Sequence, residues 1–230
     1  MVRLYLFCEG DTERAFARIV LQPHLAPLGI FIHDIPIANT IKTGKPTRGG
    51  GQNYAAMKRD ILRIQRQESG PDVFFTTMID LYAIAHDFPA LAEADKLGHM
   101  PEERVRLLET AFAVEVPDRR FVPHIQLHEF ETLLFADPRH FSLADATPEH
   151  IEELMAISRT PPEQIDGGQH TAPSKRIIAI VPGYENKKAV TGPLIAESIG
   201  LPAIRAKCPH FDAWVGKLET LRTLAPAPLV

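Results

Sequence analysis

Apolar runs that end in an acidic residue recur along the first half of the chain. Residues 4–8 are apolar throughout and lead into Glu9, and residues 73–79 lead in the same way into Asp80. Continuous apolar runs of this length are typical of strands buried on both faces of a parallel sheet. Ligands of such sheets bind at the carboxyl ends of the strands, which is where we expect both acids to lie.

Helical patterns alternate with these runs. Asp11 or Thr12 is expected to cap a helix that runs to about Leu21 and is stopped by Pro23. The same patterns predict further strands at 31–37 and 121–127 and helices at 53–67 and 102–113. Strands interleaved with helices at this spacing predict an α/β domain with a mainly parallel central sheet flanked by helices.

The pattern becomes mainly helical from about Pro138 onward. Helices are predicted at 148–158, 174–181, 194–199 and 211–221, with turns rich in Pro and Gly between them. Since no long linker interrupts the chain, we expect a core at 1–137 with a helical extension at 138–224 packed on it. Residues 225–230 are expected to form a flexible tail.

The composition is that of an ordinary soluble globular protein, with 45% hydrophobic and 23% charged residues among 230. Cys8 and Cys208 are the only cysteines, which argues against a disulfide framework or a four-cysteine zinc site. The start of the chain lacks a signal-peptide pattern and no run is long enough to span a membrane, so a cytoplasmic location without membrane contact is expected. The net charge of -4 means that nucleic-acid binding would need local basic surfaces and bridging metal ions.

A third acidic segment follows the strand predicted at 121–127. Clustered carboxylates repel one another unless a hard cation such as Mg²⁺ or Mn²⁺ neutralises them. The predicted metal ligands are Glu9, Asp80 and either Glu129 or Glu131, because residues two apart face different directions. Each acid alone is better explained as a helix-start or turn residue, so the prediction depends on the combination.

Two neighbouring residues have different expected roles. His128 could carry a proton or contact phosphate, since the pKa of histidine lies near neutrality. Glu13 is expected only to cap the first helix.

Basic residues form two groups that could contact phosphate. The first, between 174 and 192, comprises Lys175, Arg176, Lys187 and Lys188, and Gly192 would allow close backbone approach. The second is a loop at 39–52, expected to be flexible, which contains Lys45 and Arg48. Both groups are equally consistent with an ordinary solvated surface.

Other motifs are weaker. Lys45 does not belong to a nucleotide-binding P-loop, because the glycine spacing is wrong and a proline follows it. His124 and His128 straddle a predicted strand and its end, so a shared zinc site is not expected. His210 and Trp214 are expected to serve packing and capping.

Five blocks carry a resemblance to a known family; they are 9–13, 79–82 with 87–89, 128–135, 172–176 and 208–211. By these blocks the chain resembles the bacterial family called domain of unknown function 4276. That family is similar in turn to Toprim domains, the magnesium-binding folds of topoisomerases, primases and nucleases of the overcoming-lysogenization-defect type. The resemblance implies that Glu9 is a general acid or base beside the metal and that Asp80 is the first residue of an Asp-x-Asp pair. Tyr82 stands at the second aspartate position, so Glu129 or Glu131 would have to complete the site.

The resemblance also implies a function and a partner. The expected activity is that of a magnesium-dependent endonuclease in a phage-defence system, acting on DNA in preference to RNA, with an ATPase as partner. The expected catalytic residues are Glu9, Asp80, Glu131 and His128. Two alternatives remain: a non-catalytic Toprim-like subunit that binds an ATPase, which Tyr82 favours, and phosphoryl or nucleotidyl transfer on a small nucleotide. A homodimer is also left open.

Overall fold

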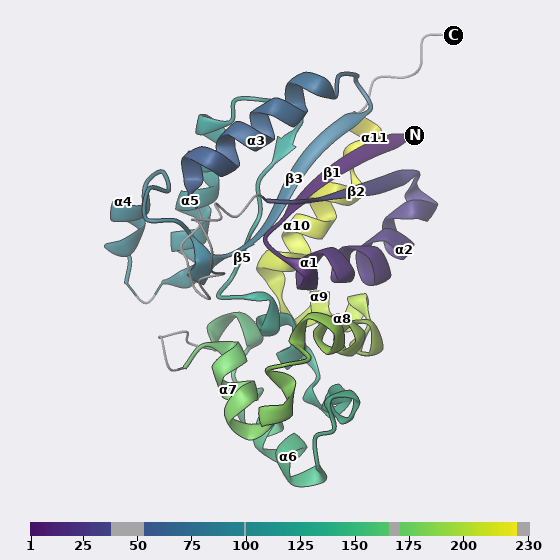
Figure 1. The fold of residues 1–230 in the computed structure, drawn as a ribbon, viewed down its shortest axis with the longest axis vertical. Coiled ribbons are helices and arrows are strands. Elements are labelled where there is room, and N and C mark those ends of the chain that lie inside the picture. The colour runs from purple at the N-terminus through teal and green to yellow at the C-terminus, as the bar shows by residue number, and fades with distance from the viewer. Residues whose placement is uncertain (38–52, 99, 166–170, 225–230) are drawn as a thin grey trace, which may run out of the picture.

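A parallel sheet forms the centre of the upper part of the molecule in Figure 1. The computed structural model describes residues 1–37, 53–98, 100–165 and 171–224. The strand order is β2-β1-β3-β4, with β5 beside the end of β3, and every pairing is parallel. The strands are β1 (Val2–Cys8), β2 (Ile30–Pro36), β3 (Val73–Asp80), β4 (Phe121–Val122) and β5 (Ile125–Gln126). The prediction of an α/β fold with a mainly parallel sheet is therefore confirmed.

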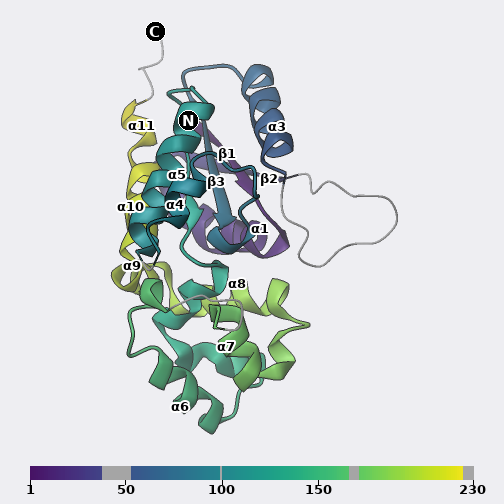
Figure 2. The ribbon, with the colours of Figure 1, turned by 90° about the vertical axis from the view of Figure 1, so that its left-hand side faces the viewer.

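Helices cover both faces of the sheet, which explains why its central strands β1 and β3 are mostly apolar. Leu4 and Leu6 of β1 face a core shared with α1 (Asp11–Phe16) and α10 (Pro209–Glu219). Phe7 faces the opposite core, together with α3 (Tyr54–Gln67) and α5 (Pro101–Glu115). Figure 2 shows α3 and α10 on opposite sides of the sheet.

The first helical region is longer than predicted. After α1 come a π-helical segment (Ala17–Leu21), α2 (Gln22–Leu25) and a 3-10 turn (Ala26–Leu28). Pro23 does not stop it, because the preceding π segment has already changed the hydrogen-bond register of the backbone. The region ends at Gly29, which has a left-handed φ of 77°.

The prediction of one strand at 121–127 is wrong. β4 and β5 are separate short strands because Pro123 has no N–H for the ladder and His124 pairs with a side chain instead. The Thr77 hydroxyl accepts the His124 N–H at 2.9 Å and donates to the His124 carbonyl at 2.8 Å.

The helical region beyond the sheet fills the lower part of the view in Figure 1. It contains two 3-10 segments, η4 (Phe130–Ala136) and η5 (Pro138–Ala144), and the helices α6 (Pro148–Ile157), α7 (Pro173–Ile180), α8 (Lys188–Ile199) and α9 (Leu201–Lys207). The chain then returns to the sheet through α10, and α11 (Leu221–Leu224) follows. Within the described ranges, no helix has the length and apolarity needed to cross a membrane.

The remaining short elements connect these layers. They are α4 (Leu91–Asp95) and 3-10 turns at Leu81–Ala83, Pro162–Gln164 and Pro182–Tyr184. α8 starts at Lys188, earlier than the predicted helix at 194–199, and it packs against α1. This contact places the start of α8 near the carboxyl end of β1.

Candidate functional site

Five carboxylates gather at the carboxyl ends of β1 and β3. Glu9 follows β1 and Asp80 ends β3; since Cys8 is in register with Met78, both acids leave the sheet at the same edge. The others are Glu13, Glu129 and Glu131, whose charges, like that of Glu9, raise the pKa of the Asp80 carboxyl. We call these five residues the acidic cluster.

Glu9 and Asp80 are in direct contact. Glu9 Oε2 accepts the Asp80 backbone N–H at 3.0 Å. Burial raises the pKa of the Asp80 carboxyl well above its usual range, and the charges of Glu9 and Glu13 raise it further. Asp80 Oδ1 is buried and has no hydrogen-bond partner among the described residues. A buried carboxylate oxygen without a partner calls for a proton or a cation.

Glu13 both caps the first helix and belongs to the acidic cluster. Its Oε2 accepts the N–H of Gly10 at 2.8 Å, so Gly10 is the cap residue, and the prediction of Asp11 or Thr12 is wrong. Glu13 is only 5% exposed, and burial and the charge of Glu9 raise the pKa of its carboxyl to about 7. The expectation that Glu13 only caps the helix is therefore incomplete.

Glu129 and Glu131 have different partners, although both contribute charge to the acidic cluster. Both oxygens of Glu129 accept hydrogen bonds from Ser174, one from its N–H and one from its hydroxyl at 3.0 Å. Ser174 lies in the first turn of α7, where backbone N–H groups have no partner within the helix. Glu131 accepts from the Tyr184 hydroxyl at 3.4 Å, and burial and the Glu129 charge raise the pKa of its carboxyl to about 7.

Gly192 allows the close approach of a side chain. A Cβ added at Gly192 would lie 2.7 Å from the Tyr184 hydroxyl and 3.1 Å from Phe130. Because Gly192 has no side chain, the Tyr184 hydroxyl can occupy this space and donate a hydrogen bond to Glu131. The sequence predicts phosphate approach at this glycine, whereas in the structure Tyr184 and Phe130 occupy the space beside it.

Among the predicted basic residues, Lys188 is the one whose charge interacts with the acidic cluster. The charge of Glu131, followed by those of Glu129 and Asp80, raises the pKa of its ammonium group. Its side chain is exposed at the start of α8, so it could meet an anion from solvent.

The other predicted phosphate ligands have different partners or lie elsewhere on the surface. Lys187 pairs with Asp145 at 2.9 Å, and Arg176 donates to the Thr171 carbonyl at 2.7 Å. Lys175 is exposed on α7. Lys45 and Arg48, together with the predicted loop at 39–52, lie outside the described residues.

His128 is held between two partners. Its Nε2 lies 3.0 Å from the Glu163 carbonyl, which can only accept, so Nε2 carries a proton. In the neutral ring, Nδ1 then accepts from the Tyr82 hydroxyl at 2.5 Å. His128 is 3% exposed and Tyr82 is 39% exposed, so the Tyr82 hydroxyl offers the His128 ring a route for a proton to solvent.

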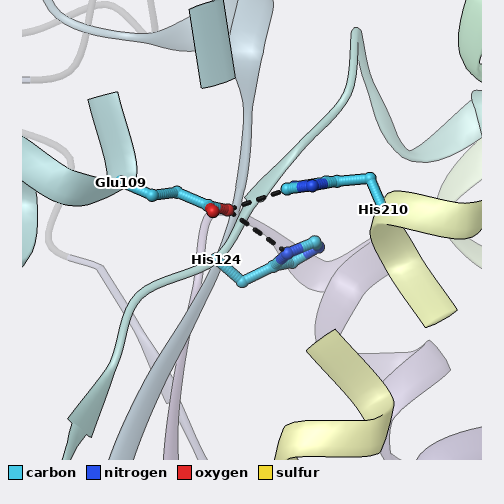
Figure 3. Close-up of side chains that lie close together, drawn as sticks. All are labelled: Glu109, His124 and His210. Atoms are coloured by element: carbon cyan, nitrogen blue, oxygen red, sulfur yellow. Dashed lines mark hydrogen bonds and ion pairs between the residues drawn. The ribbon is translucent and has the colours of Figure 1, made fainter. Parts of the chain in front are cut away.

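In the described part of the chain, the acidic cluster does not bring three ligand atoms from different residues within 4.8 Å of one another. Among the residues that the structure describes, only Glu109, His124 and His210 bring three candidate ligand atoms within 4.8 Å of one another (Figure 3). Sequence reasoning missed this group because its members are far apart along the chain. No local pattern identifies Glu109, although His210 lies in one of the blocks that carry the family resemblance.

A comparison with protein-family models identifies the family. The model called domain of unknown function (DUF4276) matches residues 8–219. The chain belongs to the DUF4276 family. Its matched region includes the whole acidic cluster and the Glu109–His124–His210 group. Searches of curated proteins and of solved structures gave no match.

Proposed function

We propose that this DUF4276 protein is a metal-dependent nuclease that cleaves phosphodiester bonds at the acidic cluster. The observation that carries the proposal is the unpartnered oxygen of Asp80, buried among carboxylates that raise its pKa. A hard divalent cation such as Mg²⁺ or Mn²⁺ takes oxygen ligands and would neutralise this charge. The oxygen donors are of the type that such a cation takes, and binding would have to draw at least three of them together.

The ligands would be Glu9, Asp80 and one of Glu129 and Glu131. When bound, the cation would polarise a phosphate and lower the pKa of a bound water. Glu131 is the better third ligand, because both oxygens of Glu129 already accept from Ser174.

The chain supplies the other functions needed for hydrolysis. Lys188 faces the same carboxylates from the exposed start of α8 and would stabilise charge on a bound phosphate. Glu9 is oriented by the Asp80 N–H and would act as general acid or base beside the metal. His128 is proposed to hold or move a proton through the Tyr82 hydroxyl.

Exposed lysines at the starts of α7 and α8 favour a polymeric phosphate substrate. Lys175, Lys187 and Lys188 are all exposed on the first turns of α7 and α8 or next to them. Such residues suit a nucleic-acid backbone, and we propose DNA in preference to RNA. A role in phage defence together with an ATPase is part of the same proposal and rests on the family resemblance.

An assay of cleavage tests the proposal. Purified protein is incubated with supercoiled plasmid or with RNA in Mg²⁺ or Mn²⁺, alongside Glu9→Gln, Asp80→Asn and the control Glu93→Gln, whose side chain is exposed on α4. We expect Glu9→Gln and Asp80→Asn to reduce cleavage at least about a hundredfold, because each removes a metal ligand or its charge. The control should cleave normally. Activity that survives both cluster substitutions would rule out this site.

A second candidate is a non-catalytic subunit that binds an ATPase. It is favoured by Tyr82, which offers a hydroxyl bonded to His128 where a Toprim domain would offer a carboxylate. The two candidates differ in metal binding. Calorimetric titration that detects no Mg²⁺ binding at millimolar concentration, with no effect of Glu9→Gln, would favour the subunit.

A further inference from the structure

Glu109, His124 and His210 come together from three separate elements. Glu109 lies on α5, His124 lies between β4 and β5, and His210 lies in the first turn of α10. Glu109 Oε1 is 3.1 Å from His210 Nε2 and 3.6 Å from His124 Nδ1. Figure 3 shows both imidazole rings beside the Glu109 carboxylate.

His124 lacks the hydrogen bonds that a buried imidazole normally makes. It is 0% exposed, and neither of its ring nitrogens has a hydrogen-bond partner among the described residues. Its ring is fixed by stacking on Trp214, with ring centroids 4.2 Å apart and planes 7° apart. A fixed, buried histidine whose nitrogens make no hydrogen bond, and whose nearest acceptor is a carboxylate 3.6 Å away, is well placed to share a cation with that carboxylate.

The group also opens onto a pocket. A cavity of about 280 Å³ lies between α5 and α10, and its walls include all three residues. The other lining residues include Arg106, Lys217 and Trp214. An ion could therefore reach the group from solvent without opening the sheet.

We propose that Glu109, His124 and His210 bind a divalent transition-metal ion, with Zn²⁺ as the best match. Two imidazoles and a carboxylate are ligands that Zn²⁺ accepts, whereas Mg²⁺ takes oxygen ligands. Zinc ligands in a tetrahedral site lie about 3.3 Å apart, and the two separations from Glu109 fall on either side of that value. Three protein ligands leave a fourth position open toward the pocket. This site is independent of the proposed nuclease function.

Binding requires a local change at His210. Its Nε2 now carries a proton, since both the Glu109 carboxylate and the Ile125 carbonyl, each 3.1 Å away, can only accept. For that nitrogen to coordinate a metal, its proton must leave: from an imidazolium one proton goes to solvent, and in a neutral ring the proton moves to Nδ1. The two imidazole planes are 22° apart and face each other, so the ring of His210 must also rotate to aim its lone pair. Rotation about the last torsion of histidine costs little.

Zinc titration of the full chain tests the proposal. The protein is freed of metal with a chelator, then titrated with Zn²⁺ against a chromophoric chelator, and the bound zinc is counted by elemental analysis. We expect one Zn²⁺ per chain. Glu109→Gln and His210→Ala should each weaken binding at least about tenfold, because each removes a ligand.

Two matched controls separate this site from the others. His86→Ala removes an exposed histidine, and Glu131→Gln alters the acidic cluster; both should bind Zn²⁺ as the unaltered chain does. Circular dichroism shows whether each variant is folded. The proposal is overturned if the unaltered chain binds no zinc at micromolar concentration, or if folded Glu109→Gln binds it unchanged; in that case Glu109 and His210 form only an ion pair.

Discussion

Tyr184 connects the acidic cluster to the packing of the helical region. Its hydroxyl reaches Glu131 only because Gly192 has no side chain at the point of contact. Burial, together with the charge of Glu131, raises the pKa of the Tyr184 hydroxyl well above its usual range, so it stays a donor to the carboxylate. At the scale of single residues, a glycine thus determines how Glu131 is held.

Substitution of Gly192 should therefore destabilise the protein. Gly192→Ala places a methyl group against Tyr184 and Phe130, and overpacking of this kind costs about 1–3 kcal/mol. The matched control is Gly216→Ala in α10, where an added Cβ meets no atom within 4 Å; it should be neutral or stabilising by about 0.5–1 kcal/mol. Urea unfolding measures both free energies. Equal effects of the two substitutions would show that Gly192 makes no special contact.

At the scale of elements, the difference between local and distant partners decides what the sequence can predict. α3 could be predicted from local signals, since Asn53 accepts the Ala56 N–H at 3.0 Å, three residues along. α10 has no cap of this kind. The N–H groups of His210 and Phe211 donate to Glu163 from 47 and 48 residues away, each at 3.0 Å.

The same distinction applies to the sites. The acidic cluster could be predicted because Glu9 and Asp80 each end an apolar strand and parallel register then aligns them. The Glu109–His124–His210 group could not, because only the packing of α5 and α10 on the sheet brings it together. The split of β4 from β5 depends on Thr77, which no pattern around residues 121–127 reveals.

Loss of the distant cap should weaken the attachment of α10. Glu163 is 2% exposed, so Glu163→Ala leaves two backbone N–H groups buried without their acceptor, at a cost of about 1–3 kcal/mol. Glu197→Ala, on the exposed side of α8, should change the free energy of unfolding by less than about 0.5 kcal/mol. Thermal or urea unfolding of the two variants gives the comparison. A Glu163→Ala variant as stable as Glu197→Ala would contradict this role.

At the scale of the whole molecule, the net charge of -4 hides an uneven distribution of charge. The acidic cluster places five carboxylates at one edge of the sheet, and burial raises the pKa of several of them. Glu109 behaves in the opposite way: burial raises the pKa of its carboxyl, but the neighbouring His124 and His210 rings outweigh this effect and lower that pKa to about 2. The two groups therefore affect stability in different pH ranges.

Stability without metal should fall as the pH rises from about 5 to 8. Glu13 and Glu131 bind protons more tightly in the folded protein, where their pKa is about 7, than in the unfolded chain, so deprotonation through this range favours unfolding. Glu131→Gln should reduce the slope, and Mg²⁺ should raise the melting temperature more at pH 8 than at pH 5.5. Thermal melts across this range measure both effects. A Mg²⁺ effect that is equal at the two pH values would contradict the account.

The central claim is that the acidic cluster binds a hard divalent cation, and direct titration with Mn²⁺ tests it most directly. Free Mn²⁺ is followed by electron paramagnetic resonance for the unaltered chain, Glu9→Gln, Asp80→Asn, the surface control Glu93→Gln and the zinc-group variant Glu109→Gln. The account predicts that the unaltered chain, Glu93→Gln and Glu109→Gln bind Mn²⁺ alike and that the two cluster variants bind it at least about tenfold more weakly. Equal Mn²⁺ affinity in all five proteins, or no binding to the unaltered chain, would contradict it.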